Sequence, residues 1–279
     1  MTCGSYFTFR TLKEISDCIP SVANSNGILH PNNVTASIKN LGKTYEGREI
    51  QMISMSLEVR MDNSCVIWRL KTSHSRIISF DTPKKGDITR PAILIDCGIH
   101  AREWVSVEFC IYVIQQLLTD KSVEVLEKFD FHIIPVVNPD GYAYSHKTDR
   151  MWRKNRESTG SMACFGVDVN RNFDVGFGEI GTVGSFVDWM ASNNTCHEIY
   201  HGPNSFSSSE AKGIQSAIHH IQRNQKLAAY LTVHSYGQVI TTDGFLCKNN
   251  TLLSFVEFLG TVHYPTKMNT NLSAPYLLI

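Results

Sequence analysis

Two histidines and one glutamate are the residues of this sequence whose types and spacing best fit metal chemistry. His100 and Glu103 stand three positions apart, shortly after an apolar run that ends at Asp96. His234 follows another apolar run, 134 residues further along the chain. Two imidazoles and one carboxylate are a donor set for catalytic Zn²⁺, because they leave a fourth position open for water or substrate. The pattern therefore predicts metal-assisted hydrolysis.

The alternative is that these three are ordinary polar residues. The chain has 11 histidines, and an H-x-x-E pair alone is a weak indication of a metal. His132 lies inside an apolar run, so we interpret it as a hydrogen-bonded core residue and not as a ligand. No two cysteines show C-x-x-C spacing, so a structural zinc knuckle is not expected.

Strands must carry these residues to one place. The runs 92–96, 130–137 and 229–233 are almost continuously apolar, which is typical of strands buried on both faces. Strands alternating with helices predict a single α/β domain with a mixed, mostly parallel central sheet and helices on both faces. Ligands of such sheets bind beyond the carboxyl ends of the strands. His100 and His234 both follow such an end.

Further elements follow from local signals. The sequence predicts strands at 50–57 and 64–70, helices at 9–19 and 105–118, and a third helix that ends at about 224. A capping box at 207–210 begins the last of these helices. The tetrapeptide at 138–141, Asn-Pro-Asp-Gly, is typical of a turn. The long glycine-containing stretch 149–207 is predicted to be a functional loop region or disordered.

Composition narrows the classes of partner. Lysine plus arginine and aspartate plus glutamate each number 26, so no net charge attracts nucleic acid. No apolar run is long enough to cross a bilayer, so neither a nucleic acid nor a membrane is an expected partner. A chain of 279 residues fits one large domain, which we expect to be monomeric.

Several longer motifs occur in the order found in one known family. They are KTYEGR at 43–48, DCGIHAREW at 96–104, PVVNPDGY at 135–142, RMWRKNR at 150–156, GVDVNRNFD at 166–174, YHG at 200–202 and TVHSYGQ at 232–238. Through them, residues from about 9 to 240 resemble the M14 zinc metallocarboxypeptidases, the group of pancreatic carboxypeptidases A and B. The resemblance implies that family's fold, one Zn²⁺ per chain, and peptide or protein substrates with a free C-terminal carboxylate.

The resemblance also implies roles for single residues. His100, Glu103 and His234 would hold the zinc ion. Arg153 would polarise the scissile carbonyl and stabilise its oxyanion, and a fixed cation aimed at developing charge is usually a large catalytic term. Without the resemblance, surface solvation is the more common fate of an arginine.

Substrate recognition is implied in the same way. Asn170 and Arg171 would hold the terminal carboxylate, because a guanidinium offers a planar fork to two oxygens. Without the resemblance, turn formation explains Asn170 and surface solvation explains Arg171. The residues implied to line the outer subsites are Arg102, Ser235 and Tyr236.

One disulfide is implied by the family pattern, between Cys164 and Cys196. The alternative is two free thiols. The bridge is favoured if the protein is secreted, because cytosolic thiols stay reduced. The resemblance suggests an extracellular protein, although residues 1–9 do not have the pattern of a signal peptide.

The end of the chain departs from the family pattern. Only 45 residues follow His234, whereas the family continues considerably further and there supplies a substrate-covering tyrosine, a catalytic glutamate and the specificity pocket. Glu257 faintly resembles that glutamate, but 254–259 also fits the apolar face of a helix. Tyr264 and Tyr276 are weaker candidates for the tyrosine.

These observations predict how the chain is divided and what it does. We expect an N-terminal extension at 1–8, an incomplete catalytic domain at 9–246 and an atypical tail at 247–279. The expected function is zinc-dependent hydrolysis of C-terminal peptide bonds. The alternative is a catalytically impaired zinc- or peptide-binding fragment without a general base, and a third possibility is an incomplete gene model of an active enzyme.

Overall fold

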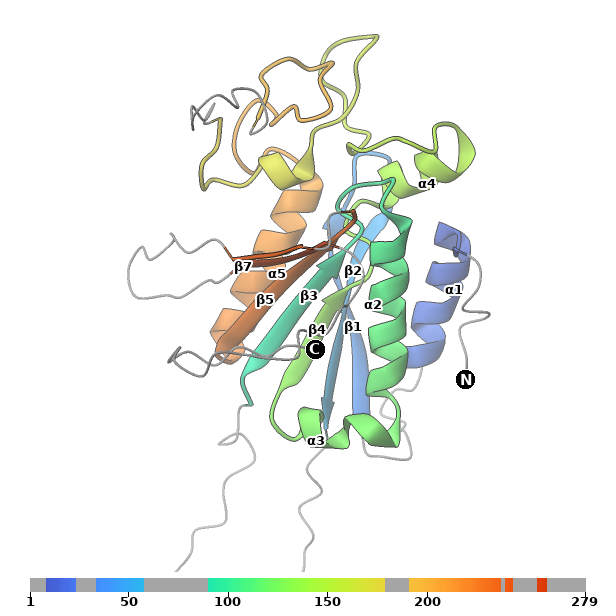
Figure 1. Cartoon of the computed structure of the whole chain (residues 1–279), viewed down its shortest axis with the longest axis vertical. Coiled ribbons are helices and arrows are strands. Elements are labelled where there is room, and N and C mark those ends of the chain that lie inside the picture. The colour runs from blue at the N-terminus through green and yellow to red at the C-terminus, as the bar shows by residue number, and fades with distance from the viewer. Residues whose placement is uncertain are drawn as a thin grey trace, which may run out of the picture.

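A seven-stranded mixed sheet lies at the centre of the computed structural model (Figure 1). The structure describes residues 9–23, 34–57, 90–178, 191–236, 239–242 and 255–259. The sheet order is β1-β2-β4-β3-β5-β7-β6. The strands are β1 (Val34–Lys43), β2 (Glu49–Leu57), β3 (Ala92–Cys97), β4 (Asp130–Ile134), β5 (Leu227–His234), β6 (Val239–Thr242) and β7 (Phe255–Leu259).

The four central strands are parallel, and the two edges are antiparallel. Strand β3 pairs in parallel with β4 and β5, and β5 pairs in parallel with β7. The outer pairs β1–β2, β2–β4 and β6–β7 are antiparallel. The predicted mixed α/β sheet is confirmed. The parallel centre brings the carboxyl ends of β3, β4, β5 and β7 to the same edge.

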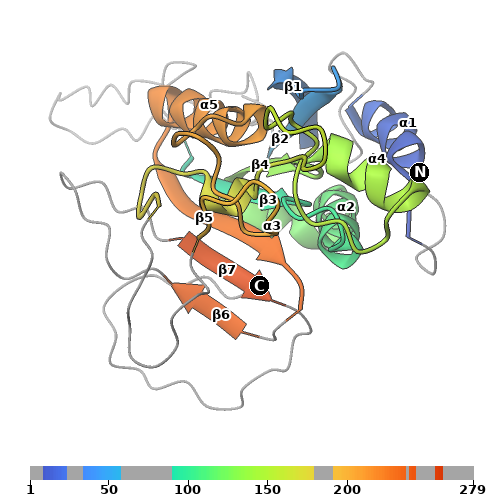
Figure 2. The same ribbon diagram turned by 90° about the horizontal axis from the view of Figure 1, so that it is seen from above.

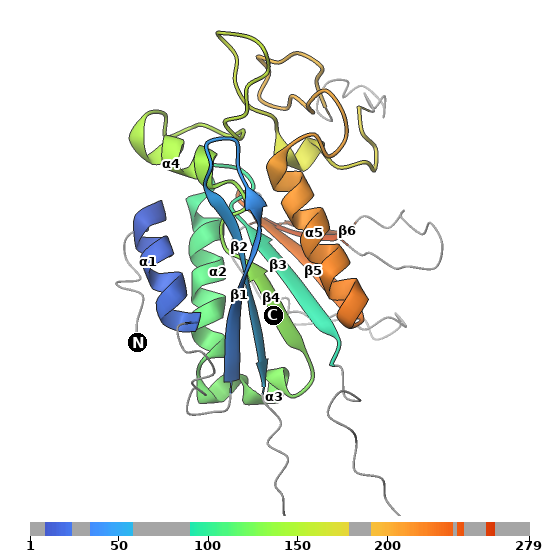
Figure 3. The ribbon, with the colours of Figure 1, turned by 180° about the vertical axis from the view of Figure 1, so that it is seen from behind.

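Helices cover both faces of the sheet, as predicted (Figures 2 and 3). One apolar core joins α1 and α2 to one face, and a second joins α5 to the other. The helices are α1 (Leu12–Ala23), α2 (Trp104–Leu117), α3 (Val123–Leu126), α4 (Pro139–Lys147) and α5 (Ser209–Asn224), with short 3₁₀ turns η1 (Asp120–Ser122) and η2 (Val169–Arg171). The helix predicted at 9–19 begins and ends a few residues later.

Strand β3 is buried along its whole length. Its alternate side chains enter the two cores, so Ile93 and Ile95 face α2 while Leu94 faces α5. This explains the lack of alternation in the sequence, because neither face is exposed to water.

The predicted turn at 138–141 is instead the start of helix α4. The side chain of Asn138 accepts a hydrogen bond from the backbone N–H of Gly141, and Pro139 occupies the first helical position. Asparagine caps helices and proline is tolerated at their first residue, so the same letters fit either structure. Strand β4 stops at Ile134, before Pro135, which has no N–H for a further ladder bond.

The N-terminal cap of α5 also differs from the prediction. Ser208, and not Ser207, caps the helix by accepting a hydrogen bond from the N–H of Ala211. Glu210 is buried and accepts from the amide of Asn155, so it does not close a capping box. Tertiary packing has drawn the carboxylate inward.

Two further predictions concern the segments 64–70 and 254–259. The strand expected at 64–70 lies outside the described residues. The alternative that 254–259 forms a helix is wrong, because Phe255–Leu259 is strand β7 and pairs with β5. This strand lies in the range expected as an atypical tail, and the division of the chain into three ranges stays a prediction. Among the described residues, no helix is long and apolar enough to cross a membrane.

Candidate metal centre

The loop between β3 and α2 holds the first two proposed ligands. Gly98 takes a positive φ of 67°, and a Cβ there would lie 2.8 Å from a methyl carbon of Val107, so glycine alone fits this turn. The hydroxyl of Ser106 donates to the carbonyl of Glu103 and accepts from the N–H of Gly98. These bonds fix the loop before any ligand arrives.

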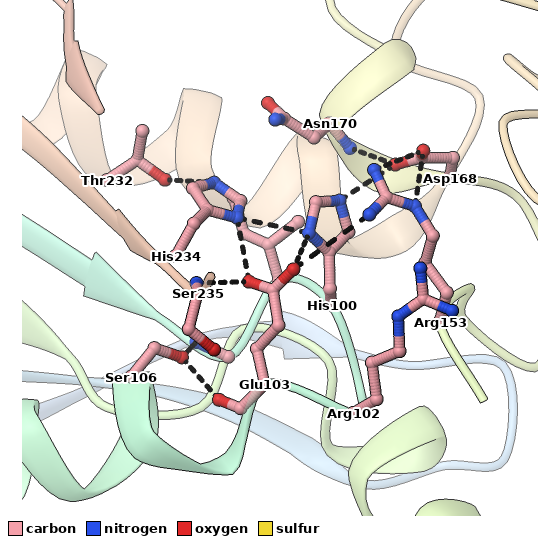
Figure 4. A network of polar contacts seen from close by, with 12 residues as sticks. His100, Arg102, Glu103, Ser106, Arg153, Asp168, Asn170, Thr232, His234 and Ser235 are labelled. Carbon is pink, nitrogen blue, oxygen red and sulfur yellow. Dashed lines mark hydrogen bonds and ion pairs between the residues drawn. The ribbon is translucent and has the colours of Figure 1, made fainter. Parts of the chain in front are cut away.

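The three predicted ligands meet at one point (Figure 4). Nδ1 of His100 lies 2.7 Å from Oε1 of Glu103, and Nδ1 of His234 lies 3.0 Å from Oε2 of the same carboxylate. The two Nδ1 atoms are 3.0 Å apart. All three side chains are buried, and among the described residues they are the one group with metal-ligand spacing.

This donor set fits a zinc ion. Bonds of about 2.0–2.2 Å in a tetrahedral site place neighbouring ligand atoms roughly 3.3 Å apart, a few tenths of an ångström more than the spacings here. One cation can bind the two imidazole nitrogens and the carboxylate at the same time. A small outward movement of the three side chains is enough to accommodate it.

The charges in the site favour an ionised Glu103 and a protonated His100. Burial alone would raise the pKa of Glu103, but the charge of His100 and the hydrogen-bonding contacts with His100 and His234 in the metal-free site hold that pKa well below its usual value. Burial alone would lower the pKa of His100, but Glu103 and Asp168 outweigh it and raise the pKa. Carboxylates thus surround the imidazoles and favour positive charge between them.

Asp168 completes the site, and the sequence interpretation missed it. Its side chain is fully buried, with Oδ1 lying 3.2 Å from Nε2 of His100. Its other oxygen accepts a hydrogen bond from Nε of Arg153 at 3.0 Å and forms an ion pair with Nη2 of the same guanidinium at 2.9 Å. The signal was present, because an acidic residue stands inside the matched motif at 166–174.

Asp168 therefore links a proposed ligand to the proposed oxyanion-stabilising arginine. Burial opposes ionisation, but the charges of His100 and Arg153 outweigh it and hold the pKa of Asp168 well below its usual value. Nη1 of Arg153 lies 3.9 Å from Oε1 of Glu103, so the guanidinium borders the ligand cluster (Figure 4). The structure brings Arg153 to the site, as its motif implied.

Asn170 and Arg171 form the 3₁₀ turn beside Asp168. The N–H of Asn170 donates to Asp168, and Nη1 of Arg171 donates to the carbonyl of Asn170. The Nε of Arg171 is buried and has no hydrogen-bond partner among the described residues. A buried donor without a partner is costly, which makes this turn a suitable receptor for an anionic group.

The three residues implied for outer subsites occupy the rim in different ways. The backbone N–H of Ser235 donates to Oε2 of Glu103 at 3.0 Å, while Tyr236 is 94% exposed. The guanidinium of Arg102 lies outside the ligand cluster and pairs with Glu198 at 3.2 Å. Of these three, Ser235 alone hydrogen-bonds to a proposed ligand.

Two disulfides support the site. The predicted bridge between Cys164 and Cys196 is confirmed, and it holds the loop that carries Glu198. A second bridge joins Cys97, at the end of β3, to Cys110 on α2. The sequence interpretation missed this pair, although Cys97 directly precedes the ligand loop.

Glu257, which faintly resembles the family's catalytic glutamate, lies on strand β7. In the parallel ladder between β5 and β7, Glu257 pairs with Thr232, two residues before His234. The position is therefore on the strand next to the ligand-bearing strand. Tyr264 and Tyr276 lie outside the described residues.

Two features define the class of protein. They are the α/β sheet and the buried centre of two histidines and one glutamate at the carboxyl edge of that sheet. Residues 28–251 match the family model described as zinc carboxypeptidase (Peptidase_M14). The chain therefore belongs to the zinc carboxypeptidase family, which confirms the resemblance seen in the motifs.

Named relatives agree with this assignment. Carboxypeptidase B of Rattus norvegicus is 35% identical over 243 residues, which are 85% of this chain and 47% of the relative. Carboxypeptidase A1 of Homo sapiens is 33% identical over 241 residues, which are 85% of this chain and 46% of the relative. The chain spans about half the length of the curated relatives it matches.

Solved structures show the same fold. Bovine thrombin-activatable fibrinolysis inhibitor, in complex with tick carboxypeptidase inhibitor, is 30% identical with a TM-score of 0.63, covering 85% of this chain and 64% of that chain. Carboxypeptidase A from Helicoverpa armigera is 27% identical with a TM-score of 0.63, covering 85% and 48%.

Proposed function

We propose that this chain is a zinc-dependent metallocarboxypeptidase that hydrolyses the C-terminal peptide bond of peptides and proteins. One observation carries the proposal: two imidazoles and a carboxylate converge from two distant strand ends beside an arginine fixed by a buried aspartate. Family membership supports the same chemistry. His100, Glu103 and His234 would hold one zinc ion, which would lower the pKa of a bound water and polarise a carbonyl.

Arg153 would stabilise the charge that develops on the carbonyl oxygen. Its guanidinium is held by a hydrogen bond and an ion pair to Asp168 and is mostly buried, so it needs little reorganisation during the reaction. Such preorganised cations in a water-poor site are worth more than in bulk water. Because Asp168 also contacts His100, the cation and the metal ligand are held in one fixed geometry.

Asn170 and Arg171 would bind the terminal carboxylate of the substrate. The Nε of Arg171, which has no partner within the described part of the chain, and its guanidinium fork can donate to two carboxylate oxygens. Such a clamp makes cleavage depend on a free chain end. Arg102, Ser235 and Tyr236 would line the substrate further from the cleaved bond. The protein is proposed to be monomeric and extracellular, and two disulfides are consistent with an oxidising compartment.

The second candidate is a zinc- or peptide-binding fragment with impaired catalysis. It is favoured by the state of the two described carboxylates nearest the centre. Glu103 is engaged with His100 and His234, and Asp168 with His100 and Arg153, so neither is available as a general base. Loss of a general base typically lowers the rate about 10²- to 10⁴-fold.

One experiment separates these functions. A blocked dipeptide with a free C-terminus and its C-terminal amide are incubated with the zinc-loaded chain, and zinc content is measured on the same sample. Much faster hydrolysis of the free acid than of the amide supports the carboxypeptidase. Zinc binding or peptide binding without turnover supports the fragment, and a chain that binds neither zinc nor peptide refutes both.

A further inference from the structure

His234 is held on both sides of its ring. Its Nδ1 faces the other two proposed ligands, at 3.0 Å from Nδ1 of His100 and 3.0 Å from Oε2 of Glu103. Its Nε2 lies 3.1 Å from the hydroxyl oxygen of Thr232 (Figure 4). The first nitrogen can bind a cation only if its lone pair is free of a proton, so the proton must sit on the second nitrogen.

A buried chain of groups continues from Thr232. The Thr232 hydroxyl lies 3.0 Å from Oδ1 of Asp96, and the phenol of Tyr230 donates to Oδ2. Residues 230, 232 and 234 alternate along β5 and therefore share one face of the strand. The parallel register sets Asp96 beside Thr232. Asp96 and Tyr230 are at most 2% exposed, and Thr232 is 6% exposed.

The number of protons available decides which group donates each hydrogen bond between His234, Thr232 and Asp96. Burial raises the pKa of Asp96 to about 6 against the opposing hydrogen bonds, so the group is mainly a carboxylate at neutral pH. A carboxylate only accepts hydrogen bonds, and a hydroxyl has one proton to give. Thr232 therefore donates to Asp96 and must accept from Nε2–H of His234.

We propose that Asp96 and Thr232 are positioning residues that hold the Nε2–H of His234 and so direct the lone pair of its Nδ1 to the cation. In the tautomer with the proton on Nδ1 the Thr232 hydroxyl would have to turn toward Nε2, which would leave an oxygen of Asp96 without its donor in a dry site. That tautomer would also point an N–H at the place of the cation. The inference rests on the proposed zinc site and adds to it a relay that reaches from β5 to β3.

The two imidazole ligands are thus oriented by different means. Nε2 of His100 is bound directly by the carboxylate of Asp168, whereas Nε2 of His234 reaches a carboxylate through a hydroxyl. Partners of this kind typically change metal affinity about 10- to 100-fold when they are removed. The hydroxyl of Thr232 should therefore matter although it touches neither metal nor substrate.

The test measures the zinc dissociation constant of the purified full chain by competition with a chromogenic chelator. Thr232→Val keeps the shape of the side chain and removes the hydroxyl, so we expect binding about 10- to 100-fold weaker. Thr232→Ser keeps the hydroxyl and should bind nearly as the wild type does. Ser54→Ala is the matched control, because it removes the hydroxyl that lies 2.9 Å from Nδ1 of His132, away from the site, and should leave zinc affinity unchanged.

A double-mutant cycle tests whether Asp96 acts through Thr232. Asp96→Ala should weaken zinc binding, and Asp96→Ala with Thr232→Val should be no weaker than the worse single variant, because both remove the same relay. Losses that multiply would show that Asp96 acts by another route and would overturn its place in the relay.

A spectroscopic readout reports on the hydrogen bond at Nε2 of His234 and not on zinc affinity. Long-range ¹H–¹⁵N spectra of the zinc-loaded protein should show a slowly exchanging proton on Nε2 of His234 in the wild type and in Thr232→Ser, and a faster-exchanging one in Thr232→Val. Equal exchange in Thr232→Val and wild type, or equal zinc affinity of the two proteins, overturns the proposal. If the wild type binds zinc and only these comparisons fail, the relay is wrong and the proposed function stands, whereas a wild type that binds no zinc overturns both.

Discussion

Two buried histidine clusters on the same sheet make different use of the same side chain. His132, on β4, has Ser54 at 2.9 Å from Nδ1 and the amide of Gln225 at 2.6 Å from Nε2. At the carboxyl edge, His100 and His234 face each other across Glu103. Each nitrogen of His132 has a neutral partner of its own, whereas the nitrogens at the edge share one point.

The pKa values of histidines in the two clusters are shifted in opposite directions. Burial, with a smaller repulsion from His220, lowers the pKa of His132 to about 4 and keeps the ring neutral. Around His100 the carboxylates of Glu103 and Asp168 overcome burial and raise the pKa. Burial of a histidine therefore does not mark a functional site. An excess of negative charge with converging ligand atoms does mark one.

The largest expected effect comes from removing one histidine of each cluster. His234→Ala removes a ligand, so the purified protein should lose its zinc on dialysis, and hydrolysis of a free-acid dipeptide should disappear. His132→Ala should keep zinc while losing about 1–3 kcal/mol of stability, because Ser54 and Gln225 lose their partner. Metal analysis and urea unfolding of both variants measure this. Full zinc occupancy in His234→Ala would remove the basis of the proposed site.

The next effect separates two arginines, each paired with an aspartate. Arg153 pairs with Asp168 beside the ligands, and Arg90 pairs with Asp130 at the start of β4. Arg153→Ala should lower kcat about 10²- to 10³-fold, as loss of an oxyanion donor does. Arg90→Ala should reduce stability and leave kcat unchanged. Equal kcat values for the two variants would contradict the role of Arg153.

A smaller effect is expected at Arg171. Its buried Nε has no partner among the described residues, unlike Nε of Arg90. Arg171→Ala should lower kcat/KM for a free-acid substrate about 10- to 100-fold, since hydrogen bonds to charged groups contribute roughly 1.5–3 kcal/mol. The slow hydrolysis of the C-terminal amide should not change. An equal loss on both substrates would show that Arg171 supports the structure and does not hold the carboxylate.

The smallest expected effect is a pH dependence of stability from His132. Its folded pKa of about 4 lies below the unfolded value of 6.5, so the unfolded chain binds more protons between these values. This contribution is complete above pH 6.5 and is lost as the pH falls toward 4, by about 2 kcal/mol between pH 7 and pH 5.

Comparing wild type with His132→Gln isolates that contribution. The buried Glu210, whose pKa is raised to about 7, shifts stability in the opposite direction but remains in both proteins. Urea unfolding at pH 7 and pH 5 should show the difference between the two proteins shrinking at the lower pH. A difference that stays constant would mean that His132 is not held neutral by burial.

Much of the site could be predicted from local sequence. Continuous apolar runs at 92–96 and 229–233 identified buried strands, and the residue that follows such a strand lies at a fixed edge of a parallel sheet. His100 and His234 were found in this way. Arg153, Asn170 and Arg171 came from motif resemblance, because an arginine has no local pattern that separates solvation from catalysis.

The sequence by itself determined the ligand types, the strand cores and the glycine at position 98, because these depend on chemistry and short-range sterics. Only the tertiary structure decided which groups surround the ligands. Asp168 and Asp96 come from separate segments, and the hydrogen bonds that join them to His100 and, through Thr232, to His234 exist only once the strands are in register. Such long-range contacts leave no periodic signal in the chain, because each partner is placed by packing far from its own neighbours.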